Sequence, residues 1–158
     1  MRTLKIDVME NQTTSTSFFK VASFTALGLV LFFLIMKLLN LITIVELRFV
    51  NFFILLIGIR YMLLTRRKES QGKLEYLSGM MLGFMTSVMA SVLFSCFVFV
   101  YLSFFDHTLM QYIINTQPFG SYLSPGGAAL IIVAEGAASG AILSFALMHI
   151  INKDNANG

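Results

Sequence analysis

The stretch Leu74–Phe105 reads LEYLSGMMLGFMTSVMASVLFSCFVFVYLSFF, and it decides the fold. It carries no charge after Glu75, and as a helix it is long enough to cross the roughly 30 Å hydrocarbon core of a bilayer. Small side chains allow a second helix backbone to come close, which is a main route to helix association in lipid. Within the stretch a small residue recurs at every fourth position: Gly79, Gly83, Ser87, Ser91 and Ser95. The stretch therefore predicts a membrane-spanning helix with a packing stripe along one side.

The composition of the whole chain is typical of a membrane protein. Of its 158 residues 57% are hydrophobic and only 12% are charged, too few charges to cover the surface of a soluble domain of this size. The net charge of +3 does not indicate a nucleic-acid surface, because the positive residues lie at the edges of apolar runs. A single cysteine, Cys96, excludes an internal disulfide. We expect the lipid bilayer to be the principal partner, and no nucleic acid.

Three further apolar stretches have the length of a membrane span. With the first stretch they predict four transmembrane helices, at about 18–39, 44–64, 74–105 and 126–151. Residues 1–17 and 153–158 remain as short polar tails, the first with little order of its own. A short amphipathic surface helix is expected between the last two spans, from apolar residues at helical spacing: Leu109, Met110, Ile113 and Ile114. The expected fold is all-α, an up-down-up-down bundle of four membrane helices with this extra helix.

Positive charge predicts the orientation of the bundle. The strongest cluster is Arg66, Arg67 and Lys68, between the second and third spans. Short loops rich in Lys and Arg lie on the cytoplasmic side, so four spans place both termini in the cytoplasm and the protein in the inner membrane. The same cluster has a second interpretation, as a contact for anionic lipid headgroups.

The last predicted span repeats the small-residue pattern. Gly136, Gly140 and Ser144 follow one another at four-residue spacing. One interpretation is that this stripe packs against the stripe of the third span within the chain. It is the favoured one, because antiparallel neighbours in sequence usually pack together. The other is that one stripe faces another subunit.

Glu135 is the most specific single candidate for a functional residue. At 1.5 Å per residue it lies roughly 13 Å inside the last span. An intramembrane carboxylate is costly, so it must be protonated, paired or hydrated. A structural interpretation pairs it with Arg48 or Asn51 at matching depth on the second span. A functional interpretation makes it a proton or ion site that continues through Ser139 and His149.

Three segments carry a resemblance to a known family. They are GIRY through RRK at residues 58–68, GMMLG at 79–83 and FFDHTLMQYI at 104–113. Together they resemble an uncharacterised bacterial family of small four-helix integral membrane proteins, a domain-of-unknown-function family. The resemblance covers about residues 18–153 and implies four spans in a cytoplasmic membrane. It implies no activity and no catalytic residues, and Glu135 departs from the pattern expected of the family.

The functional hypotheses follow from what the sequence contains. It holds no constellation typical of a serine, cysteine or metal hydrolase, so we predict no catalytic residue, cofactor or metal site. The first hypothesis is a non-enzymatic protein that works through helix packing, as an accessory subunit of a membrane complex or as a small oligomer. The alternative is a small transporter or proton-coupled carrier that uses Glu135.

Overall fold

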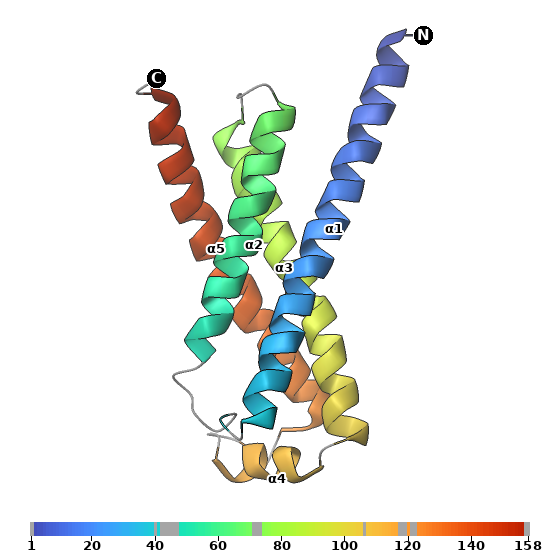
Figure 1. Ribbon diagram of the computed structural model, residues 1–158, viewed down its shortest axis with the longest axis vertical. Helices are drawn as coiled ribbons and strands as arrows, with labels where there is room; N and C mark the ends of the chain where they lie inside the picture. The colour runs from blue at the N-terminus through green and yellow to red at the C-terminus, as the bar shows by residue number, and fades with distance from the viewer. Residues whose placement is uncertain are drawn as a thin grey trace.

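The chain folds into a bundle of α-helices. The structure, a computed structural model, describes all residues except 1, 40, 42–47, 71–73, 106, 117–119, 121–122 and 157–158. Its helices are α1 (Arg2–Leu38), α2 (Arg48–Glu69), α3 (Tyr76–Phe104), α4 (His107–Thr116) and α5 (Pro125–Ala156) (Figure 1). All except α4 are long and apolar enough to cross a membrane. The predicted all-α fold with four candidate spans and a short extra helix is confirmed.

The ends of the chain differ from the prediction. The helix α1 begins at Arg2, so the segment expected to have little order, residues 1–17, is helical from its second residue on. The reason is that this segment contains neither Gly nor Pro, and a helix started by the apolar span can continue through it. In the same way α5 continues to Ala156, so most of the expected tail 153–158 belongs to the last helix.

The helix α2 is displaced relative to its predicted range. The predicted start at residue 44 lies outside the described residues, and the described helix runs from Arg48 to Glu69 rather than ending at 64. In its last turn an Arg66 guanidinium nitrogen lies 3.4 Å from a carboxylate oxygen of Glu69. This pair lies three residues apart on the helix, and such a spacing supports the added turn.

The helix α3 is the central element of the bundle. It packs most extensively against α5, and it also contacts α1, α2 and α4. The helix α2 fills the remaining side, between α1 and α5. Both termini lie at one end of the bundle and α4 crosses the opposite end (Figure 1). The topology is therefore up-down-up-down, with one end covered by the surface helix.

Aromatic rings join α1 to α3, and buried apolar side chains hold α4 against the core. The ring of Phe33 on α1 lies edge-on to those of Phe94, Phe97 and Tyr101, with centroids 5.3 to 6.2 Å apart. Edge-to-face aromatic pairs add stabilisation beyond the area that they bury. The helix α4 buries Leu109 and Met110 in the core, while Gln111 on the same helix is exposed. The predicted amphipathic character of α4 is confirmed.

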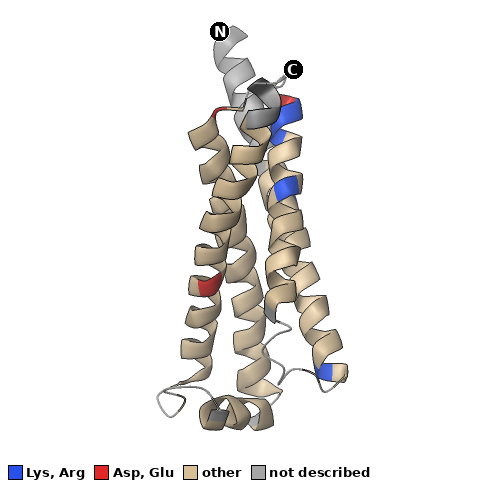
Figure 2. Ribbon diagram, turned by 90° about the vertical axis from the view of Figure 1, so that its left-hand side faces the viewer, with Lys and Arg blue, Asp and Glu red and all other residues tan. Residues whose placement is uncertain are grey.

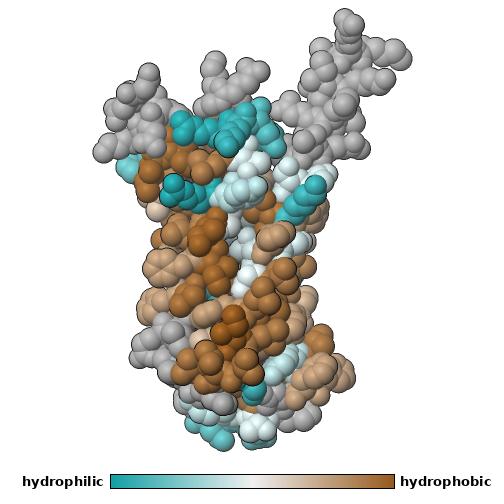
Figure 3. Space-filling view, viewed as in Figure 1, coloured by the Kyte–Doolittle hydropathy of each residue, from teal (hydrophilic) through white to brown (hydrophobic). Residues whose placement is uncertain are grey.

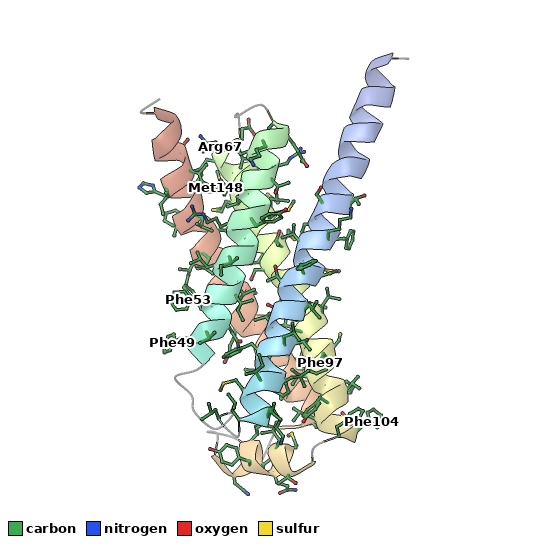
Figure 4. The ribbon with its side chains drawn as sticks, viewed as in Figure 1. Phe49, Phe53, Arg67, Phe97, Phe104 and Met148 are labelled. Atoms are coloured by element: carbon green, nitrogen blue, oxygen red, sulfur yellow. The ribbon has the colours of Figure 1, made fainter. Side chains whose placement is uncertain are left out.

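The outside of the bundle is apolar over most of its height. A hydrophobic belt separates two hydrophilic ends (Figure 3). Lys and Arg residues gather mainly toward the helix ends (Figure 2). On α2, Phe49 and Phe53 are 71% and 59% exposed, and their rings lie on the outer side of the helix (Figure 4). Large apolar side chains in this position are suited to contact with lipid chains.

Candidate functional site

The two small-residue stripes meet each other inside the chain. Each step of four residues along α3 is matched by a step of four back along α5. The resulting pairs are Gly79 with Met148, Gly83 with Ser144, Ser87 with Gly140, and Ser91 with Gly136. We call this contact the α3–α5 seam.

Backbone proximity explains why the seam needs glycine. A Cβ atom added to Gly83 would lie 2.6 Å from Ser144 Oγ. One added to Gly136 would overlap the side chain of Ser91, and one added to Gly140 would overlap Ser87. Such separations are closer than real Cβ contacts, so any larger side chain at these glycines must push the helices apart.

Hydroxyl groups line the seam and are held in different ways. Ser87 Oγ donates a hydrogen bond of 2.8 Å to the carbonyl oxygen of Gly136, which joins the two helices directly. Ser95 Oγ donates instead to the Val92 carbonyl within its own helix, at 2.9 Å. Ser144 is fully buried, and among the described residues its Oγ has no hydrogen-bond partner.

A second close contact joins α1 to α2, a pair that was not predicted from the sequence. A Cβ atom on Gly58 would overlap the side chain of Thr25, and one on Gly28 would lie 3.3 Å from Ile54 Cγ2. Thr25 is buried and its Oγ1 donates to the Val21 carbonyl at 2.8 Å. The available signal was a glycine in mid-span, but single glycines are common in membrane helices.

Glu135 lies on the outward face of α5, and not in the bundle interior. Its side chain is exposed, ten residues or about 15 Å from the Pro125 end of the helix. The residues that share this exposed surface are Ala134, Ala138 and Ala141. We call these three alanines with Glu135 the α5 outer notch. Larger exposed side chains bound it on both sides, Ile131 at one end and Ile142 at the other.

Asn51 lies at the same depth in the bundle as Glu135, and its predicted pairing with Glu135 stays a prediction. A Cβ on Gly83 would lie 2.9 Å from Ile59 Cγ2, which sets the register of α2 against α3. Eight residues back along α2, Asn51 is therefore level with Ser91, and so with the middle of α5. Asn51 Oδ1 is buried and makes no hydrogen bond to any described residue. The side chain of Arg48 lies outside the described residues, so its predicted pairing with Glu135 stays a prediction.

The predicted polar path is not assembled inside the bundle. Glu135 and His149 are both exposed, and Ser139 between them is half-buried. A path through the interior would need these side chains to point toward α2 and α3. Glu135 and His149 instead lie on the outer side of α5.

The predicted basic cluster, Arg66, Arg67 and Lys68, lies at the end of the bundle that holds both termini. Arg66 pairs with Glu69, Arg67 is half-buried and Lys68 is exposed. Arg67 lies at the C-terminal end of α2 (Figure 4). Arg60 precedes Arg67 by seven residues, or about two helical turns, and is exposed within the candidate span.

These features define a class of protein. Four apolar helices of spanning length, with lipid-type side chains outward and small residues between the helices, make this a multi-pass integral membrane protein. The sequence pattern of the family described as "Protein of unknown function (DUF4199)" matches residues 20–118, and the chain belongs to that family. The expected membership in an uncharacterised family is thereby confirmed. No curated protein and no solved structure matches the chain.

The region that matches the family pattern ends before α5. It runs from α1 to just beyond α4, so α5 lies outside it. The resemblance inferred from the sequence extended to residue 153, and this last part has no support from the match. Glu135 and the glycines of α5 thus lie in the part of the chain that the family pattern does not cover.

Proposed function

We propose that the protein acts without catalysis, as a subunit that assembles with other membrane-spanning chains through the α5 outer notch. It is an accessory subunit of a membrane complex or a small oligomer. The observation that supports this most directly is the exposed position of Glu135 about 15 Å from the Pro125 end of α5, among exposed alanines. The α3–α5 seam occupies the glycine stripe of α5 within the chain, and the notch is the small-residue surface that faces outward.

Energetics favour a covered notch over one that faces lipid. An acidic side chain at the centre of a membrane helix costs about 2.5–3.5 kcal/mol on insertion scales. A protein segment packed over Glu135 would remove its side chain from contact with hydrocarbon. Alanines beside it would let the covering helix approach closely, whereas Phe49 and Phe53 on α2 hold any neighbour at a distance.

The proposed orientation places both termini in the cytoplasm of a cell with an inner membrane. The termini share one end of the bundle with the C-terminal end of α2 and the start of α3 (Figure 1). That end carries Arg66, Arg67 and Lys68, and positive clusters of this kind are retained on the cytoplasmic side.

Site-specific crosslinking in native membranes tests the assembly. In a Cys96→Ser background, Ala138→Cys and Ile57→Cys each receive a thiol-linked photo-crosslinker, the second as a control on the outward face of α2. Both positions are exposed. We expect Ala138→Cys to give a protein adduct, of twice the chain mass for a second copy or of another mass for a different subunit. The control should remain at monomer mass. Monomer alone at both positions would overturn the proposal.

A proton-coupled carrier that uses Glu135 is the second candidate. The observation in its favour is the carboxylate itself, at a depth where a bound proton or cation offsets the cost of the charge. Glu135→Gln separates the two functions. A carrier loses its flux in proteoliposomes with this substitution, whereas an assembly protein shows no flux to lose.

A further inference from the structure

The outward face of α2 changes from apolar to basic along its length. Toward the α4 end of the bundle its exposed side chains are Phe49, Phe53 and Ile57, which are 71%, 59% and 68% exposed. Toward the end that holds the termini they are Arg60, Tyr61, Leu64 and Lys68. At 100° per residue these seven side chains fall within a sector of roughly 120°. They form one continuous surface, which we call the α2 lipid face.

We propose that the α2 lipid face binds an anionic glycerophospholipid in the leaflet next to the C-terminal end of α2. The lipid phosphate lies between Arg60 and Lys68, and an acyl chain follows Ile57 and Phe53 toward the middle of the membrane. This inference goes beyond the proposed function and does not depend on it, because it concerns a different face of the bundle.

The spacing of the two cations suits a single headgroup. Arg60 and Lys68 are eight residues apart, or about 12 Å along the helix axis. Their long side chains can close this distance from the two ends, because both carry flexible aliphatic stems below the charged group. Leu64 lies between them and gives the lipid backbone an apolar surface. The Tyr61 side chain, 62% exposed, offers a phenolic hydroxyl at the same level.

The depth of Arg60 favours a lipid over other anions. This residue lies inside the candidate span Phe49–Glu69, where a guanidinium exposed to hydrocarbon is costly. A phosphate that belongs to a lipid can reach this depth with its acyl chains in the membrane, whereas a free phosphate would have to leave water. Arg66 lies 3.4 Å from Glu69, so part of the local positive charge is already neutralised within the helix. Charge complementarity thus selects an anionic headgroup at Arg60 and Lys68.

The size of the side chains argues against a protein partner on this face. Close helix association in lipid uses small residues, as in the α3–α5 seam. The α2 lipid face presents Phe, Ile and Leu instead, with rings on the outer side of the helix (Figure 4). Flexible acyl chains can fill the spaces between such side chains.

Lipid titration of the purified full-length protein tests the proposal. Binding of phosphatidylglycerol and of phosphatidylcholine is measured in detergent by native mass spectrometry. At about 1 kcal/mol for each basic residue, Arg60→Gln with Lys68→Gln should lower the affinity for phosphatidylglycerol about 30-fold. Binding of phosphatidylcholine should change little. A loss of less than threefold would overturn the proposal.

Lys20 provides a matched control. It is an exposed cation on α1, and the Gly58–Thr25 contact places it level with residue 63 of α2, at the same membrane depth. Lys20→Gln should retain the wild-type affinity, and an equal loss in this variant would show a non-specific charge effect and overturn the site.

Two measurements on the wild-type protein keep the test decisive if the double variant does not fold. The wild-type chain should prefer phosphatidylglycerol to phosphatidylcholine at least tenfold, and equal affinity would overturn the proposal. Inorganic phosphate at millimolar concentration should not displace the lipid. Displacement would identify a site for free phosphate and overturn the assignment to lipid.

Discussion

Single atoms decide how closely α3 and α5 approach. At Gly136 the missing Cβ leaves room for the Ser91 side chain, and one turn away the Ser87 hydroxyl reaches the Gly136 carbonyl oxygen. Bonds of this kind between membrane helices are individually weak, on average about 0.6 kcal/mol. The close fit and its many van der Waals contacts therefore contribute more to the seam than any one hydrogen bond does.

Substitution of a seam glycine should therefore destabilise the fold. Gly136→Ala forces the new Cβ into Ser91, and overpacking of this kind costs about 1–3 kcal/mol. Gly126→Ala is the matched control in the same helix, because its Cβ would meet no described atom closer than 3.8 Å. Unfolding of both variants in mixed detergent micelles with increasing SDS measures the difference. Equal stability of the two variants would show that the seam tolerates a methyl group.

The helices were predictable as elements, but their ends and rotations were less so. Uninterrupted apolar runs such as that of α3 leave few alternatives to a membrane span. The extension of α1 to Arg2 and of α2 to Glu69 was missed, because polar residues without Gly or Pro do not show where a helix stops. The four-residue spacing identified the seam residues of α3 and α5.

The placement of Glu135 shows what spacing alone leaves open. The sequence shows that Glu135 does not share a face with Gly136 and Gly140, but two other faces of α5 then remain available. One faces α2 and one faces outward, and the choice depends on how α2 crosses the bundle. That crossing arises from contacts between residues distant in sequence, such as Ile59 with Gly83, so the spacing within α5 alone does not show which neighbour Glu135 meets.

The helix α4 should act as a packed cover for one end of the bundle. Leu109→Ala removes a side chain that is 7% exposed and should lower the free energy of unfolding by about 2 kcal/mol. Gln111→Ala, at an exposed position of the same helix, should change it by no more than about 0.5 kcal/mol. The same SDS unfolding assay compares the two. A helix that merely rests on the membrane surface would give no difference.

At the scale of the whole molecule, the even number of spans predicts that both termini lie on the same side of the membrane. Four spans place the two ends of the chain on one side of the membrane, and both lie at the same end of the bundle (Figure 1). Reporter domains that are active only in the cytoplasm, fused separately to each terminus, should both be active. Activity of one fusion alone would require an odd number of spans.

The central position of α3 also has a consequence for synthesis of the chain. Its partner α5 ends about 50 residues later, and at roughly 5–20 residues per second a ribosome needs several seconds to complete that segment. During this interval the serines and glycines of α3 lie without the helix that covers them in the finished protein. A glycine-rich span of another chain can pack against this uncovered face of α3 during the interval. Exchange of helices between copies therefore competes with the packing of each chain's own α5 against its α3.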